Sequence, residues 1–137
     1  MNEFKTFSVS PLIDESGAPA YLANKLTEKI RNYFQQNTRM ILVKQNGDLM
    51  VDGRITKYAT APNAIGSDSR ATSNRLTVTV AITAYNNIKS QNILDNQSFE
   101  KFREYPVDTP LPSVESNLNE EIANLLVVEI FNGIFTW

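Results

Sequence analysis

The sequence contains no cysteine and no histidine. The first absence excludes disulfides and thiol nucleophiles, and the two together remove the usual zinc ligands and the commonest general base. Uninterrupted apolar runs are only a few residues long, so the sequence offers no helix that could span a bilayer. Because most catalytic templates fail on these absences, we expect a protein that is not an enzyme and that binds neither a metal nor another cofactor.

The sequence also has no large excess of basic or of acidic residues. There are 13 basic and 15 acidic residues, giving a net charge of -2, so the basic footprint of a nucleic-acid-binding protein is absent and no nucleic-acid partner is expected. Residues Met1 to Phe4 have neither the basic region nor the apolar core of a signal peptide, which fits a cytoplasmic protein or one whose export segment has been removed. The length of 137 residues predicts a single domain over residues 1–137.

The clearest pattern is the strict alternation of apolar and polar residues from Thr72 to Tyr85. A period of two predicts a strand with one buried face and one polar face. The predicted buried residues are Leu76, Val78, Val80, Ile82 and Ala84.

Two segments have helical spacing. The first follows Pro19 and carries a stripe at Leu22, Leu26, Ile30 and Tyr33. The second, about Val114 to Phe135, is apolar around most of its last turns, where Val128, Phe131 and Phe135 lie outside the main stripe. Glu129 falls inside that stripe, where an ionised carboxylate needs a partner, so we interpret it as a paired structural residue.

Asn46-Gly47 lies between two apolar runs and predicts a β-hairpin, since both turn positions of such a hairpin need a positive φ. In this register Val43 faces Met50 and Arg39 faces Arg54. Ile41, Val43 and Met50 then lie on the second face of the sheet. That face is either covered by the N-terminal segment or left for a partner.

The remaining segments complete the predicted fold. We expect short strands at Phe4–Ser10 and Phe99–Tyr105, and loops at Ala61–Ser73 and Asn86–Gln97. The economical architecture is an α+β two-layer sandwich, in which two helices pack on one face of a mostly antiparallel four- to five-stranded sheet.

Basic residues gather on the predicted strands. Like charges opposed on a sheet are destabilising, so an anion should lie beside Arg39 and Arg54. Internal pairing with Asp52 or Glu100 is the favoured interpretation, and a phosphorylated ligand is the alternative. The full basic set is Arg39, Arg54, Arg75, Lys101 and Arg103.

The order of these patterns resembles the lipopolysaccharide-assembly lipoprotein family (LptE). The resemblance runs through Gly47-Asp48-Leu49 into Asp52-Gly53-Arg54-Ile55, then Asn74 to Val80, Phe99 to Tyr105, and Ile130-Phe131-Asn132 with Trp137. It implies a small two-helix domain on the periplasmic side of the outer membrane, anchored by an acylated N-terminal cysteine. Since the sequence has no cysteine, we expect it to begin after the lipidated residue.

The resemblance also implies a function. Members of the family plug the lumen of the outer-membrane β-barrel LptD, help it to assemble and contact lipopolysaccharide. A generic periplasmic protein-interaction module of the same fold is the alternative. The basic set then becomes the candidate for lipopolysaccharide phosphates, and the candidate partner contacts are Ile41, Val43, Met50, Val128, Phe131 and Phe135.

Overall fold

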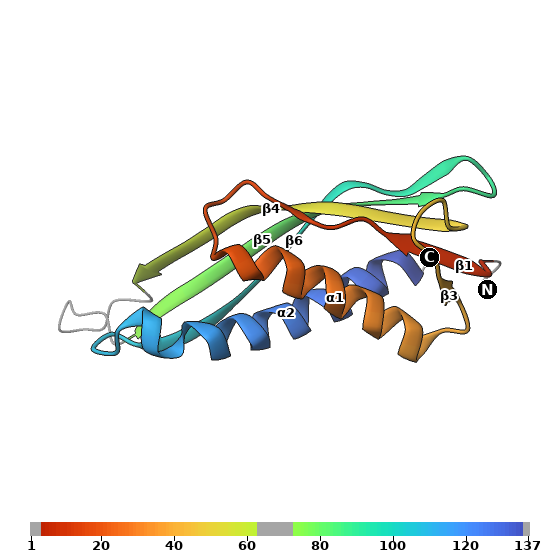
Figure 1. Ribbon diagram of the computed structural model, residues 1–137. Helices are drawn as coiled ribbons and strands as arrows, with labels where there is room; N and C mark the ends of the chain where they lie inside the picture. The colour runs from red at the N-terminus through yellow and green to blue at the C-terminus, as the bar shows by residue number, and fades with distance from the viewer. Residues whose placement is uncertain (1–3, 63–72, 136–137) are drawn as a thin grey trace.

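The computed structural model describes residues 4–62 and 73–135. Two helices lie along one face of a six-stranded sheet, which confirms the predicted α+β layers (Figure 1). The strands are β1 (Thr6–Val9), β2 (Ile13–Asp14), β3 (Ile41–Leu42), β4 (Leu49–Pro62), β5 (Ser73–Asn86) and β6 (Gln91–Pro106), and the helices are α1 (Ala20–Asn37) and α2 (Leu111–Phe135).

Strand β5 is the centre of an antiparallel β4-β5-β6 meander. Its five predicted inward side chains, Leu76 to Ala84 in steps of two, are each at most 1% exposed. The predicted faces are therefore confirmed, because alternation specifies the register of a strand wherever one face is buried.

The predicted hairpin at Asn46-Gly47 is wrong. Strand β1 lies between β3 and β4 and pairs with both in parallel, so β3 and β4 do not pair with each other. Gly47 is instead placed against the backbone of Phe7, where an added Cβ would lie 2.6 Å from Phe7 Cα. Asn46 has the positive φ that the Asn-Gly signal implies, 59°, but the signal could not show that a third strand enters between the two runs and that both runs are parallel to it.

Loop and strand contacts fix this crossing. The Asp48 carboxylate accepts hydrogen bonds from the backbone amides of Lys5 and Thr6 at 2.9 and 3.4 Å, and Ser8 Oγ accepts one from the Gly47 amide at 3.2 Å. As a result Arg39 and Arg54 are not opposed: Arg54 pairs in register with Ala81 of β5.

The helices bury the stripes that the sequence predicts. In α1, Leu22, Leu26 and Ile30 are at most 1% exposed, and Pro19 immediately precedes the first helical residue. Helix α2 begins at Leu111, three residues before the predicted start. Glu129 lies on the flank of α2 facing β6, not inside the stripe; its side chain is 48% exposed and its carboxylate is 3.2 Å from Lys101 Nζ.

The segment from Asn86 to Gln97 is not the predicted loop. Only Asn87 to Ser90 form a turn, in which the Asn86 side chain accepts hydrogen bonds from the amides of Ile88 and Lys89. Strand β6 begins at Gln91 and tolerates polar residues because it is an edge strand with one exposed face, and Asn96 has a φ of 53° where its register with β5 shifts. Of the predicted loop Ala61–Ser73, residues 63–72 lie outside the described part of the chain.

Replacing Gly47 by alanine tests the β1 crossing. The new Cβ would meet backbone atoms of β1 at 2.6 Å, and backbone cannot rotate away as a side chain can, so we expect a loss of about 3 kcal/mol in the free energy of unfolding. Gly17→Ala is the control. Gly17 has open space around it, so a new Cβ would meet no atom, and only the positive φ of 79° disfavours alanine. This variant should lose about 1 kcal/mol in the free energy of unfolding. Urea denaturation that ranks the two variants equally would contradict this account.

A second prediction concerns the contact between the helices. Glu120 accepts hydrogen bonds from Lys25 and Lys29 of α1 at 2.7 and 2.6 Å, which lowers the pKa of its carboxyl group to about 2. A depressed pKa stabilises the fold above the ordinary value of 4.5, and this contribution disappears as the pH falls toward 2.

Because the Glu120 side chain is 46% exposed, Glu120→Gln should cost only about 0.5–1 kcal/mol at pH 7. Urea denaturation of both proteins at pH 7 and pH 2.5 should show a much smaller difference at the lower pH, because most of the contribution is lost between the ordinary pKa and the lowered one. A difference that is unchanged between the two would exclude a charge effect.

Candidate interaction surface

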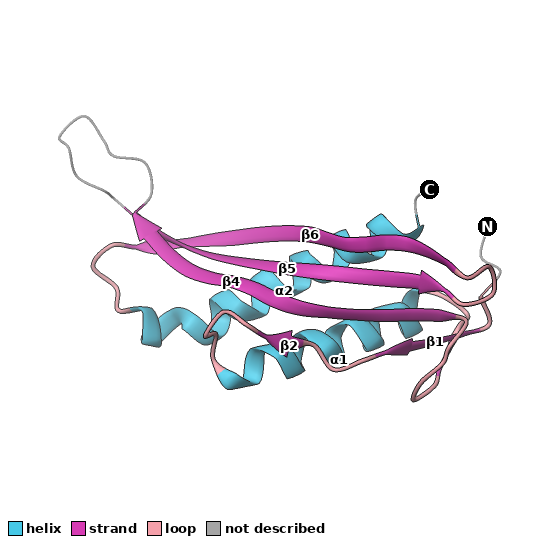
Figure 2. Cartoon of the chain, turned by 90° about the horizontal axis from the view of Figure 1, so that it is seen from above, coloured by secondary structure: helices cyan, strands magenta, loops and turns pink. Residues whose placement is uncertain are grey.

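The sheet has one face that the helices leave uncovered, and it lies in front of the helices in Figure 2. The residues of β5 that point to this face are mainly threonines and alternate with the buried row. The face is thus mostly polar, with Met50 and Tyr85 paired in register across β4 and β5 and Phe102 exposed on β6.

The candidate partner contacts divide among three environments. Ile41, on β3, is 66% exposed, and Met50 is partly buried on the open face. Val128 is 38% exposed on α2, on the other side of the molecule. The aromatic candidates pack inward: Phe131 contacts Phe34 with ring centroids 5.4 Å apart, and Phe135 is only 9% exposed.

The sixth candidate, Val43, is partly buried and lies beside β1. Its backbone amide donates a hydrogen bond to the carbonyl oxygen of Phe7 at 2.8 Å. The six residues therefore do not form one continuous patch.

The basic candidates are also distributed, and most of them have partners within the chain. Arg54 contacts Glu15 at 2.7 Å and Asn96 at 3.0 Å, on the open face. Arg75 stacks over the ring of Phe102, with its guanidinium carbon 4.7 Å from the centroid.

Two further candidates lie along the border between β6 and α2. Lys101 pairs with Glu129 at 3.2 Å, and Arg103 pairs with Glu121 at 2.9 Å. Arg54, Lys101 and Arg103 therefore pair within the chain, but with carboxylates other than Asp52 and Glu100. Arg39 is exposed in the connection before β3, away from the other four.

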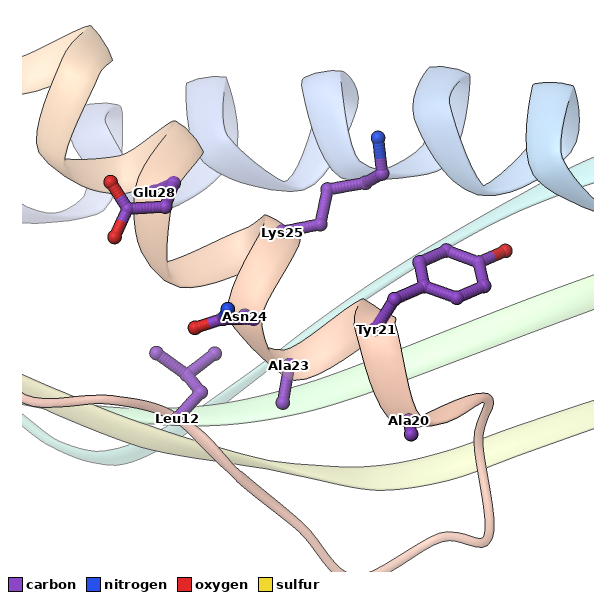
Figure 3. Close-up of a pocket in the computed structure, with 7 residues that line it drawn as sticks. All are labelled: Leu12, Ala20, Tyr21, Ala23, Asn24, Lys25 and Glu28. Atoms are coloured by element: carbon purple, nitrogen blue, oxygen red, sulfur yellow. The ribbon is translucent and has the colours of Figure 1, made fainter.

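The hollows on the surface do not gather reactive groups. An open hollow of about 730 Å³ lies along the first turns of α1. Its lining residues, which include Tyr21, Lys25 and Glu28, are labelled in Figure 3. Lys25 and Tyr21 bond to Glu120 and Asn119 of α2, and Glu28 pairs with Arg31. Each charged group of this hollow already has a partner, so it offers no free charge to a ligand.

A smaller hollow of about 250 Å³ lies beside β3. Its lining combines Arg31 and Lys44 with Leu42 and Val43. Arg31 is engaged twice, by Glu28 at 2.8 Å and by the carbonyl oxygen of Val9 at 2.6 Å. Lys44 is therefore the cation that this hollow leaves available, and no sequence pattern indicated it.

A polar network around the buried side chain of Asn119 has a structural role. Tyr58 donates to Glu115 at 2.5 Å, and Asn119 donates to Tyr58 at 3.0 Å and to Tyr21 at 2.9 Å. Burial, with the hydrogen bond to the Glu115 carboxylate, raises the pKa of the Tyr58 phenol above its ordinary value. The network joins β4 to both helices with every polar group satisfied, and a phenol that is harder to ionise is a poor general base.

Within residues 4–62 and 73–135, no group of three or more acidic side chains is placed to hold a metal ion. None of the helices in this part of the chain is long and apolar enough to cross a membrane. The described surface has the features of an interaction surface, and many of its charged side chains form ion pairs within the chain.

Comparison with solved structures shows that this fold recurs in bacterial proteins. The hypothetical protein CT253 from Chlamydia trachomatis superimposes with a TM-score of 0.66 at 7% identity, covering 98% of this chain and 99% of that one. The uncharacterized lipoprotein B from Nitrosomonas europaea gives 0.64 at 12% identity, covering 93% and 79%. A minor lipoprotein from Acinetobacter baumannii gives 0.60 at 18% identity, covering 93% and 89%.

At these identities the likeness shows the fold alone. No curated protein sequence matches the chain. The family model for lipopolysaccharide assembly, LptE, matches residues 4–134, which include the six described strands, helix α1 and all but the last residue of helix α2. The chain therefore belongs to the lipopolysaccharide-assembly family, LptE.

Proposed function

We propose that this protein is a non-enzymatic lipopolysaccharide assembly and transport factor. It works at the periplasmic face of the outer membrane, held there by an N-terminal lipid, as plug and assembly partner of an LptD-like β-barrel. The observation that carries the proposal is the family match over residues 4–134, because it spans the six described strands, helix α1 and nearly all of helix α2 and is not confined to one motif.

The surface supports a role inside another protein. A barrel lumen of the porin type is polar, so a plug needs a polar surface without a strong field of one sign. The chain has fifteen asparagines and eleven threonines. Its ion pairs, such as Arg54–Glu15 and Arg103–Glu121, neutralise surface charge locally.

Of the candidate partner contacts, Met50 and Val128 fit a barrel wall best. Met50 lies within the open sheet face and Val128 is exposed on the helix layer, so a surrounding partner would cover both sides. Phe131 and Phe135 act from inside, since their rings hold the end of α2 against α1 through Phe34. Ile41 and Val43 lie at one end of the sheet.

Introducing a carboxylate at a barrel contact tests this assignment. Met50→Asp and Val128→Asp should each reduce the barrel recovered with the tagged protein about tenfold or more, because an unpaired charge would be buried in the interface. Val107→Asp is the control: Val107 is 50% exposed in the connection between β6 and α2. Affinity purification from the cell envelope measures the effect, and failure of the unaltered protein to recover any large β-barrel would refute the proposed partner.

For lipopolysaccharide we propose that the five basic candidates contact its phosphates, and that three of them do so by exchanging their present partners. Arg54, Lys101 and Arg103 already bind carboxylates at 2.7–3.2 Å on exposed surfaces. A phosphate accepts the same charge-assisted hydrogen bonds, and arginine can bind it in a bidentate manner. Arg75 adds positive charge on the open face of the sheet, and Arg39 adds it in the connection before β3.

The double variant Arg54→Gln/Arg103→Gln should bind purified lipopolysaccharide about tenfold more weakly, and the loss should shrink at high salt. Arg31→Gln is the control. Arg31 also forms an ion pair, with Glu28 at 2.8 Å, but it is not among the candidate phosphate-binding residues. Titration with fluorescent lipopolysaccharide measures both. If Arg31→Gln binds as weakly as the double variant, the proposed contacts are wrong.

A further inference from the structure

One end of the domain carries cations that the fold does not neutralise. Lys5 immediately precedes β1, and Arg39 and Lys44 stand on either side of β3. Across residues 4–62 and 73–135, no carboxylate lies within 4.0 Å of their charged nitrogens, whereas Lys25, Lys29, Arg31, Arg54, Lys101 and Arg103 all form ion pairs.

Exposed apolar side chains lie among these cations. Ile41 is 66% exposed and Val43 is partly exposed, although both are held firmly by backbone hydrogen bonds to β1: the Ile41 amide donates to Lys5 O at 3.0 Å and the Val43 amide to Phe7 O at 2.8 Å. Ile88, in the turn between β5 and β6, is 52% exposed at the same end of the sheet. Figure 1 shows that β1 and β3 lie at this end.

Several of the described acidic residues lie far from these cations. Glu104, Asp108 and Glu115 lie toward the opposite end, around the connection from β6 to α2. The acid nearest to the cations, Asp48, accepts hydrogen bonds from the backbone amides of Lys5 and Thr6. A net charge of -2 thus conceals a positive end, which we call the β3 end and define by Lys5, Arg39, Ile41, Val43 and Lys44.

We propose that the β3 end docks on an anionic phospholipid surface. The three cations contact lipid phosphates, while Ile41 and Val43 enter the headgroup region, as apolar residues do in peripheral proteins that combine basic and apolar contacts. Charge beside an edge strand also discourages pairing between sheets, but that role does not require an exposed isoleucine among the charges. The inference goes beyond the barrel and lipopolysaccharide contacts and does not depend on either.

Vesicle co-sedimentation tests the electrostatic part. The protein should bind vesicles of phosphatidylglycerol and phosphatidylethanolamine, and not vesicles of phosphatidylcholine and phosphatidylethanolamine, with binding that weakens as salt increases. Lys44→Gln should weaken it about fivefold, the effect of one basic residue at such a surface. Lys57→Gln is the control, since Lys57 is exposed on β4 away from this end, and it should bind as the unaltered protein does.

The absence of cysteine allows the insertion to be located. Ile41→Cys and Ile13→Cys, each labelled with an environment-sensitive dye, form a matched pair, because Ile13 is 64% exposed and also lies in a two-residue edge strand. The dye at position 41 should shift to shorter wavelength on anionic vesicles, and the dye at position 13 should not. Equal shifts at the two sites, equal losses for the two lysine variants, or no binding to anionic vesicles would each overturn the proposal; in the last case a protein partner would be the remaining occupant.

Discussion

The insertion of β1 between β3 and β4 is the constraint on which much of this fold depends. Phe7 and Val9 are at most 1% exposed, and the strand pairs in parallel on both sides. Helix α1 is attached to the same strand, since Arg31 donates a hydrogen bond to Val9 O at 2.6 Å and Phe34 packs on Phe7. The position of the β3 end follows from it, because both Ile41 and Val43 take their backbone partners from β1.

Periodicity predicted most of the elements. The rows Leu76 to Ala84 and Leu22 to Ile30 are buried as their spacing predicts. The period that marks one face of a strand or helix for burial can be read from the local sequence. The pairing of strands is a non-local property. Met40 to Val43 and Leu49 to Ile55 have the same alternation whether they pair with each other or with a third strand, so the Asn46-Gly47 signal led to a hairpin that does not form.

The surface could be predicted less well than the core. Sequence spacing identified basic residues on strands, but their partners come from distant segments: Arg54 binds Glu15 beside β2, and Arg103 binds Glu121 on α2. These pairs depend on the path of α2 along β6, which no local pattern encodes. Glu129 was expected to be paired, and it is, although it reaches Lys101 from the flank of its helix. Lys5 and Lys44 had no signal of their own, because what distinguishes them is the lack of a nearby carboxylate among the described residues.

Strand β6 occupies one border of the sheet and, among the described strands, pairs only with β5. A flat sixteen-residue border would present a continuous row of amides and carbonyls to another copy of the chain. The left-handed conformation of Asn96 and the shift in register beside it divide that row into two shorter, differently oriented pieces. Uninterrupted fibril-like stacking along this border is thereby opposed, although the strand is long and partly apolar.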